Sequence, residues 1–249
     1  MARGGHAEVD RAVAAARSAF DTWGRTSAAD RAKVLHRVAE LVEERVPELA
    51  PVETRDNGSL LRSHLNSVMP RVARNFRFFA DQLTELGDEA FEMNEFVSRT
   101  EWDPSGVTVV ITPWNAPLML ATWRIAPALA AGNSVVAKPP EWAPLSASIL
   151  ADLTREAGLP DGAFNVVQGI GEEAGAALTR HPGVDRIAFT GSIETGKLVA
   201  QAAAANLTPT SLELGGKSPF VAFADADLDA VVQQAVNQFD NAGQVCLAG

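Results

Sequence analysis

The sequence predicts an α/β protein, a doubly wound parallel sheet of the Rossmann-like kind that is preceded by helices and a hairpin. One observation carries most of this prediction: after residue 107, short runs rich in β-branched residues alternate with longer helical segments. That alternation is typical of parallel sheets with helices on both faces. A second observation is that 249 residues, 47% of them hydrophobic, are enough to bury one large core or two modest ones.

Residues 9–86 show the pattern of amphipathic helices. Ser27, with Asp30 three residues later, predicts the start of a helix by a capping box. Asn57-Gly58 predicts a turn between two of these helices. Apolar residues at helical spacing support the assignment, among them Val34, Val38, Leu41 and Val42.

A hairpin is predicted at about 95–111. Residues 95–101 alternate loosely between polar and apolar side chains, and the turn-rich segment 103–106 separates them from the β-branched run 107–111. We expect this hairpin to project from the domain.

Six strands and several crossover helices follow. Segments such as 145–157 and 171–179 are long enough for helices that connect one parallel strand to the next, and 228–239 predicts one more amphipathic helix. The predicted strands are residues 107–111, 134–137, 164–167, 186–189, 211–214 and 220–223.

Charge and composition narrow the classes of function. A net charge of −10 repels a phosphate backbone, so no nucleic-acid partner is expected. The apolar runs end well before the roughly 18 residues of a membrane helix, and residues 1–10 lack the apolar stretch of a secretory signal. We therefore expect a cytoplasmic protein with no membrane partner. The four histidines and one cysteine lack metal-ligand spacing, so no metal is expected.

Three segments are candidates for holding a phosphate or a ribose. Residues 169–174 fit a dinucleotide fingerprint that follows a predicted strand, with Asp185 beyond it, although a tight turn explains the glycines equally well. Residues 191–197 have the spacing of a Walker A loop, but Leu198 supplies no hydroxyl for magnesium, which argues against an NTPase and leaves a strand-to-helix turn at 191–192 suited to a pyrophosphate.

The third candidate is Lys138-Pro139-Pro140-Glu141 at the end of a predicted strand. A carboxylate there can accept both ribose hydroxyls and would repel a 2′-phosphate, so Glu141 favours NAD over NADP. A solvated salt pair between Lys138 and Glu141 is the alternative.

Three residues are candidates for chemistry. Cys246, after a predicted helix, is a possible nucleophile, although free cysteines are more often packing residues. Glu213, between two leucines at a strand end, is a candidate base because apolar surroundings would raise the pKa of its carboxyl; a structural carboxylate is the alternative. Asn115, with prolines on both sides, can donate to an oxyanion or can be a plain turn residue.

Taken together, five motifs in order resemble the aldehyde dehydrogenase family, and the resemblance runs from about residue 9 to the end of the chain. Within the family, residues 113–142 are similar to the 5-carboxymethyl-2-hydroxymuconate semialdehyde dehydrogenases of aromatic catabolism, and Arg124 is a candidate anchor for such a charged substrate. The motifs are Pro113-Trp114-Asn115, Lys138-Pro139-Pro140-Glu141, Phe189-Thr190-Gly191-Ser192, Glu213-Leu214-Gly215-Gly216-Lys217 and Gly243-Gln244-Val245-Cys246.

The resemblance implies an oxidoreductase that converts a small-molecule aldehyde to a carboxylic acid with NAD, or with NADP. Cys246 would attack the aldehyde to form a thiohemiacetal and then a thioester, Asn115 would stabilise the oxyanion, and Glu213 would activate the hydrolytic water. Lys138 and Glu141 would hold the adenosine ribose. The other cofactor-binding residues implied are Ile111, Thr112, Trp114, Gly171, Gly191, Ser192 and Leu214.

The resemblance also implies a domain division and an assembly. Residues 1–214 would form the dinucleotide-binding domain, with the hairpin serving oligomerisation, and 215–249 would begin a catalytic domain that stops short. A homo-oligomer, a dimer or a tetramer, is expected of the full-length protein. Residues 1–249 by themselves would be inactive and aggregation-prone, and an NAD-binding module without catalysis or an inactive remnant remains the alternative.

Overall fold

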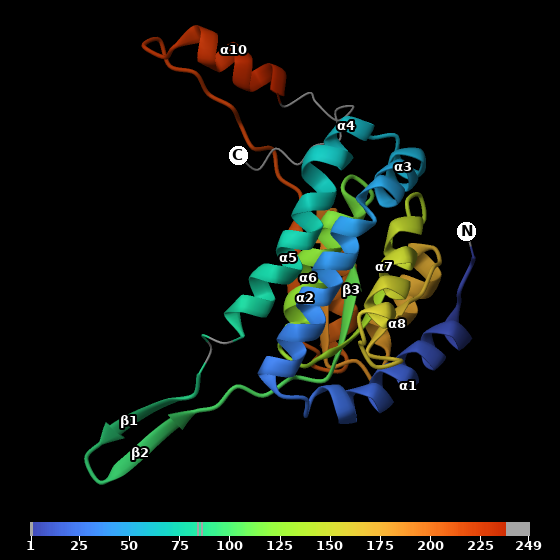
Figure 1. The fold of residues 1–249 in the computed structure, drawn as a ribbon, viewed down its shortest axis with the longest axis vertical. Helices are drawn as coiled ribbons and strands as arrows, with labels where there is room; N and C mark the ends of the chain where they lie inside the picture. The colour runs from blue at the N-terminus through green and yellow to red at the C-terminus, as the bar shows by residue number, and fades with distance from the viewer. Residues whose placement is uncertain (1, 84, 86, 238–249) are drawn as a thin grey trace.

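The computed structural model describes residues 2–83, 85 and 87–237, and its centre is a five-stranded parallel sheet (Figure 1). The strand order is β5-β4-β3-β6-β7, so the chain runs outward from β3 in one direction and then returns to continue in the other. This reversal between β3 and β6 is the arrangement of a doubly wound sheet. The strands are β3 (Val107–Ile111), β4 (Ser134–Lys138), β5 (Phe164–Val166), β6 (Arg186–Gly191) and β7 (Thr210–Leu214).

Helices cover both faces of the sheet and make up the N-terminal region (Figure 1). The N-terminal helices are α1 (His6–Trp23), α2 (Ala28–Glu44), α3 (Val46–Asn57), α4 (Leu61–Ser63), the π-helical turn η1 (His64–Val68) and α5 (Met69–Gln82). The later ones are α6 (Pro117–Ala130), α7 (Leu145–Glu156), the π-helical turn η2 (Gly171–Gly175), α8 (Ala176–Arg180), α9 (Ile193–Ala204) and α10 (Leu228–Asn237).

Two hydrophobic cores lie on opposite faces of the sheet. In β3, Val110 packs into the core with α2, α5, α6 and α7, whereas its neighbours Val107 and Val109 pack into the core with α1, α8 and α9. Alternate side chains of a strand point to opposite faces, so a run of consecutive buried valines is what a sheet covered on both sides requires.

Several local predictions are confirmed. The Ser27 hydroxyl accepts a hydrogen bond from the Asp30 N–H at the start of α2 (3.1 Å). Gly58 ends α3 with a φ of +78°, a left-handed conformation that glycine adopts without strain. Five of the six predicted strands are present as parallel strands of the sheet, and the predicted helices at 145–157 and 171–179 correspond to α7 and to η2 followed by α8.

The predicted pairing of the hairpin is wrong. Residues 96–100 form β2 (Phe96–Thr100), which pairs with β1 (Glu89–Met93) through a turn at Asn94 and Glu95, while residues 107–111 enter the parallel sheet between β4 and β6. Asn94 has a φ of +54°, a conformation that asparagine tolerates better than most residues, and it sets the turn. The β1–β2 hairpin does project from the body, as expected (Figure 1).

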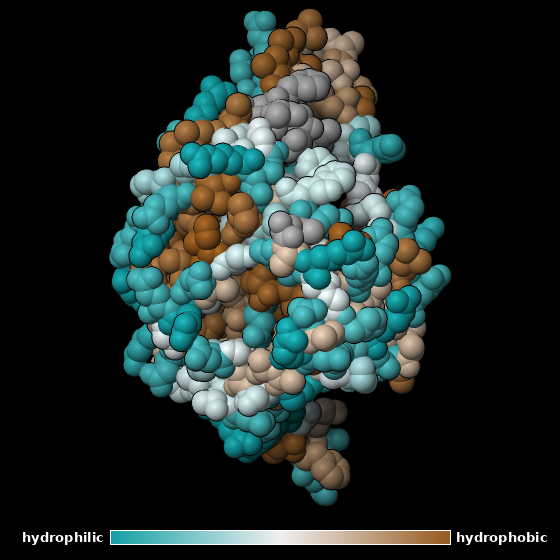
Figure 2. Space-filling view, turned by 90° about the vertical axis from the view of Figure 1, so that its right-hand side faces the viewer, coloured by the Kyte–Doolittle hydropathy of each residue, from teal (hydrophilic) through white to brown (hydrophobic). Residues whose placement is uncertain are grey.

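The predicted strand at 220–223 is also wrong. Phe220, Val221 and Phe223 are 61 to 73% exposed, and no strand in the described part of the chain pairs with this segment. Without a neighbouring strand its backbone lacks the hydrogen bonds that define a sheet. Figure 2 shows hydrophobic side chains at the two ends of the molecule, where α10 and the β1–β2 hairpin lie.

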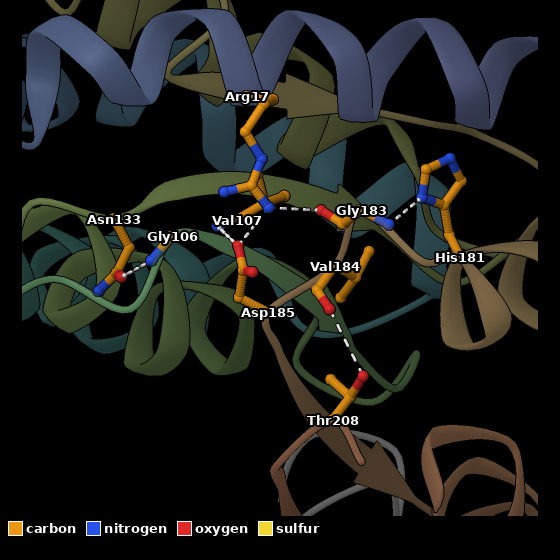
Figure 3. Close-up of polar contacts among 9 residues, drawn as sticks. All are labelled: Arg17, Gly106, Val107, Asn133, His181, Gly183, Val184, Asp185 and Thr208. Atoms are coloured by element: carbon orange, nitrogen blue, oxygen red, sulfur yellow. Dashed lines mark hydrogen bonds and ion pairs between the residues drawn. The ribbon is translucent and has the colours of Figure 1, made fainter. Parts of the chain in front are cut away.

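The amino-terminal edge of the sheet is fixed by a polar network (Figure 3). Asp185 accepts a hydrogen bond from the Val107 N–H (2.7 Å) and pairs with Arg17 of α1 (2.5 Å). Beside it, Asn133 accepts from the Gly106 N–H (3.0 Å). These contacts join α1, β3 and β6 at the edge where the strands begin. None of the helices in the described ranges is long and apolar enough to cross a membrane.

Candidate active site

The predicted site residues gather at the opposite edge of the sheet, where the strands end. Ile111, the last residue of β3, is in register with Lys138 of β4, and Gly191 of β6 is in register with Leu214 of β7. Since β6 also pairs with β3, the four strand ends form one continuous edge. In doubly wound sheets this edge, next to the reversal of strand order, is where ligands bind.

The loop after β3 presents Asn115. Thr112 is buried beneath the loop, Trp114 is 42% exposed, and Asn115 is half-buried. No hydrogen bond joins the Asn115 side chain to another residue in the described part of the chain. Among the described residues, both N–H groups of its amide are therefore left to donate to an oxygen atom of a ligand.

Lys138 is a buried cation at the end of β4. Its side chain is 3% exposed, and its Nζ donates to the Pro139 carbonyl (2.8 Å) and to Oε2 of Glu141 (3.3 Å). Burial lowers the pKa of Lys138, and the Glu141 charge opposes this shift. Gly175 lies against the lysine stem, where an added Cβ would be 3.5 Å away. The alternative of a solvated surface pair between Lys138 and Glu141 is wrong, because the Lys138 side chain is buried.

Gly191 and Ser192 form the turn between β6 and α9. The Ser192 hydroxyl accepts from the Thr195 N–H (3.1 Å) and begins the helix. Residues 193–197 are already helical, so the segment with Walker A spacing does not form a loop that could wrap around a phosphate. What remains is a turn that leads into the positive end of α9.

The segment 169–174 keeps only part of its predicted role. Gly171, at the start of η2, is exposed, with open space around its Cα, whereas Gly169 packs against the Gly4 backbone. Asp185, the acid beyond this segment, lies at the amino-terminal edge in the network of Figure 3. It cannot reach a ribose bound at the carboxyl edge, because β6 separates the two.

Glu213 lies in polar surroundings in the described part of the chain, so the apolar environment expected from its leucine neighbours is wrong. Its side chain is 65% exposed and pairs with Arg124 of α6 (2.9 Å). Leu214 lies against Gly196 of α9, where an added Cβ would be 2.5 Å from the leucine side chain. The sequence predicted Arg124 only as an anchor for substrate, whereas the structure pairs it with the predicted base.

Trp142 is a further residue at this edge that sequence reasoning missed. Its ring lies 6.4 Å from the ring of Trp114, so the loops after β3 and β4 touch through their tryptophans. Cys246 falls outside the described residues. Two surface hollows, of about 370 Å³ beside α8 and about 850 Å³ beside β5, include neither Asn115 nor Glu213, and we assign them no part in this site.

The donor set of the edge suits a dinucleotide. The buried Lys138 ammonium and the Glu141 carboxylate present a donor and an acceptor side by side, as two adjacent ribose hydroxyls require. The turn at Gly191 and Ser192 supplies a helix amino end, which suits a pyrophosphate. No cluster of three or more metal-binding side chains occurs in the described ranges.

Comparison with known proteins identifies the family. The chain is 46% identical to a 2-hydroxymuconic semialdehyde dehydrogenase of Pseudomonas sp. strain CF600, with 98% of this chain and 52% of that protein covered. It is 40% identical to a 5-carboxymethyl-2-hydroxymuconate semialdehyde dehydrogenase of Escherichia coli, with 100% and 53% covered.

Among solved structures, an NAD+ complex of an aldehyde dehydrogenase from Bacillus cereus matches with a TM-score of 0.95 and 39% identity, with 99% of this chain and 51% of that chain covered. The chain thus spans about half the length of these relatives. The sequence profile of the aldehyde dehydrogenase family matches residues 1–249. The chain belongs to the aldehyde dehydrogenase family.

Proposed function

We propose that the full-length protein oxidises an aldehyde to a carboxylic acid with NAD as the hydride acceptor. The observation that carries this proposal is the meeting of Asn115, Lys138, Gly191 and Glu213 at one edge of the sheet, from four segments far apart in the sequence. Asn115 and Glu213 supply groups for chemistry, and Lys138 and Gly191 supply groups that bind a dinucleotide. The reaction needs both.

Three residues of the chain would each carry out one part of the reaction. The Cys246 thiolate adds to the aldehyde carbon, and the Asn115 amide donates to the oxygen that becomes an oxyanion. Bound NAD would accept the hydride that leaves this carbon. Glu213 then removes a proton from the water that attacks the thioester, which releases the acid and frees the thiol. The Arg124 guanidinium lies 2.9 Å from a Glu213 oxygen and so fixes the position of this carboxylate.

The position of Glu141 favours NAD over NADP. Its carboxylate is held by the Lys138 ammonium at the end of β4, where a ribose hydroxyl would meet an acceptor and a 2′-phosphate would meet a negative charge. A relative of this chain bears the name NADP/NAD-dependent aldehyde dehydrogenase, so use of NADP at lower affinity is compatible with the family.

The substrate class we propose is a semialdehyde of aromatic catabolism, on the basis of the names of two relatives. We also propose a homo-oligomer, a dimer or a tetramer, in which the β1–β2 hairpin contributes to the interface. The hairpin supports this because its apolar side chains are exposed, namely Phe91, Met93, Phe96 and Val97.

Two measurements on the full-length protein test the proposal. Addition of 2-hydroxymuconic semialdehyde and NAD should produce NADH and the acid in equal amounts, and Cys246→Ala should abolish both. In a titration followed by tryptophan fluorescence, Glu141→Ala should weaken NAD binding by about tenfold, since an acceptor of two ribose hydroxyls is lost.

The matched control is Asp161→Ala, which removes an exposed acid from the opposite edge of the sheet and should leave NAD binding unchanged. Saturable NAD binding without turnover would favour the alternative of a binding module. Neither binding nor turnover would favour an inactive remnant.

A further inference from the structure

Two helices of the sheet domain begin without a cap of their own. The residues at the cap positions of α6 and α7 are Ala116 and Pro144, and neither supplies a side-chain acceptor. The first N–H groups of a helix need an acceptor from elsewhere, because they have no partner within the helix. Both helices matter for the proposed site, since each begins directly after one of its loops.

The acceptors come from α3. Oε2 of Glu53 accepts from the Leu118 N–H in the first turn of α6 (3.3 Å), and Oδ2 of Asp56 accepts from the Leu145 N–H in the first turn of α7 (2.9 Å). The two acids are three residues apart on α3, so they lie on the same face of one helix. One rigid element therefore holds both helix starts.

The starts of α6 and α7, which the two acids of α3 hold, are close in sequence to Asn115 and Glu141. Asn115 lies three residues before Leu118, and Glu141 lies four residues before Leu145. The two loops already touch, since the rings of Trp114 and Trp142 are 6.4 Å apart. A shift of either helix start would change this contact and would displace the Asn115 amide relative to the ribose-binding pair at Lys138 and Glu141.

The burial of Glu53 indicates a specific role. Its side chain is fully buried, and the nearby His64 is almost fully buried, with Nδ1 3.9 Å from a Glu53 oxygen. Neither ring nitrogen of His64 has a hydrogen-bond partner in the described part of the chain. Burial of an acid costs free energy unless a contact compensates it, so a buried acid is best explained by a contact that only an acceptor can make.

We infer that Glu53 and Asp56 are positioning residues that set the distance between the oxyanion-binding loop and the ribose-binding loop, with α3 as the spacer. This inference rests on the proposed function for the meaning of the two loops. The contact geometry itself does not depend on that function.

The test compares substitutions that differ only in the acceptor. Glu53→Gln and Glu53→Met are both uncharged and close to glutamate in size, but only glutamine can accept from the Leu118 N–H. In the full-length protein, Glu53→Met should lower kcat by at least about tenfold with little change in KM for NAD, since Asn115 is displaced. Glu53→Gln should recover most of the loss.

Substitution of Asp56 should affect KM for NAD and not kcat. Asp56→Ala should raise KM for NAD by about tenfold with little change in kcat, and Asp56→Asn should recover most of the affinity. The matched control is Asp152→Ala, which removes an exposed acid from α7 two turns beyond its start. It should change neither constant.

A spectroscopic readout does not require cofactor or substrate. The signal is the circular dichroism that arises when the rings of Trp114 and Trp142 interact. For each variant, it is the difference between its spectrum and the spectrum of the same variant with Trp142→Phe added. This signal should weaken in Glu53→Met and Asp56→Ala. It should persist in Glu53→Gln and Asp56→Asn.

An unchanged tryptophan signal in the variants without an acceptor would overturn the inference. A uniform loss of stability in all four variants, with kcat and KM altered together, would do the same. Failure of the proposed function would instead appear in the wild-type protein as absence of turnover, with the tryptophan signal still responding to the acceptors.

Discussion

The buried carboxyl of Glu53 makes the stability of the protein depend on pH. Burial raises the pKa of Glu53 from its ordinary value of 4.5 to about 7, while the Ser146 hydroxyl and the Leu118 N–H oppose this shift and the Asp56 charge adds to it. Each pH unit between the folded and unfolded values corresponds to about 1.4 kcal/mol, so the gap between 4.5 and about 7 amounts to about 3 kcal/mol.

The raised pKa of Glu53 determines whether the free energy of unfolding rises or falls with pH. Below pH 4.5 the carboxyl is protonated in both states and contributes nothing to the pH dependence. As pH rises toward about 7, the unfolded chain releases the proton while the folded chain keeps it, so the free energy of unfolding falls; above about 7 it levels off. Glu53→Gln keeps the size and an acceptor but cannot ionise, so it removes this dependence.

Urea unfolding of the wild type and of Glu53→Gln, at about pH 4 and about pH 8, measures the effect. Relative to the variant, the wild type should lose about 3 kcal/mol of unfolding free energy between the two conditions. Burial lowers the pKa of His64, and its Nδ1 lies 3.9 Å from a Glu53 oxygen, so the same comparison in proteins that also carry His64→Gln removes its contribution. Glu48→Gln, at an exposed acid of α3, is the control. If the difference between wild type and Glu53→Gln does not change with pH, the Glu53 carboxyl does not have a raised pKa in the folded protein.

Two further predictions concern stability. Gly106→Ala would place a Cβ 2.0 Å from the Asp185 carboxylate at a φ of +126°, so it should cost about 3 kcal/mol in urea unfolding, whereas Gly215→Ala, with open space around its Cα, should cost little. Trp23→Phe removes the buried hydrogen bond to the Leu129 carbonyl (3.1 Å) and should cost about 2 kcal/mol; a change below about 0.5 kcal/mol would contradict this.

Much of the fold could be predicted from the sequence because its signals are local. The strands at 107–111 and 134–137 are short, mostly buried runs that contain valines, and such runs mark parallel strands covered on both faces. The hairpin pairing failed because the segment 103–106 is rich in turn residues, whereas the real turn depends on the positive φ of Asn94. The segment 220–223 has strand-like residues but no partner strand in the described part of the chain, and pairing is not a local property.

Some residues of the candidate site could also be predicted from the sequence, and others could not. Asn115, Lys138 and Glu141 could be named from motifs, and the structure brings them to one edge. Glu53 and Asp56 could not, because the N–H groups that they accept from lie 65 and 89 residues away. Their role is signalled only indirectly: the residues directly before α6 and α7 are Ala116 and Pro144, which supply no side-chain acceptor.

The proposed function requires that the carboxyl edge of this sheet support aldehyde oxidation through Cys246 and Glu213. The most direct measurement is rapid mixing of the full-length Glu213→Gln protein with NAD and 2-hydroxymuconic semialdehyde, beside the wild type. We predict a burst of about one NADH for each subunit, followed by slow turnover, because the thioester forms but its hydrolysis lacks a base. Steady turnover at the wild-type rate, or a burst that survives Cys246→Ala, would contradict the roles proposed for Glu213 and Cys246.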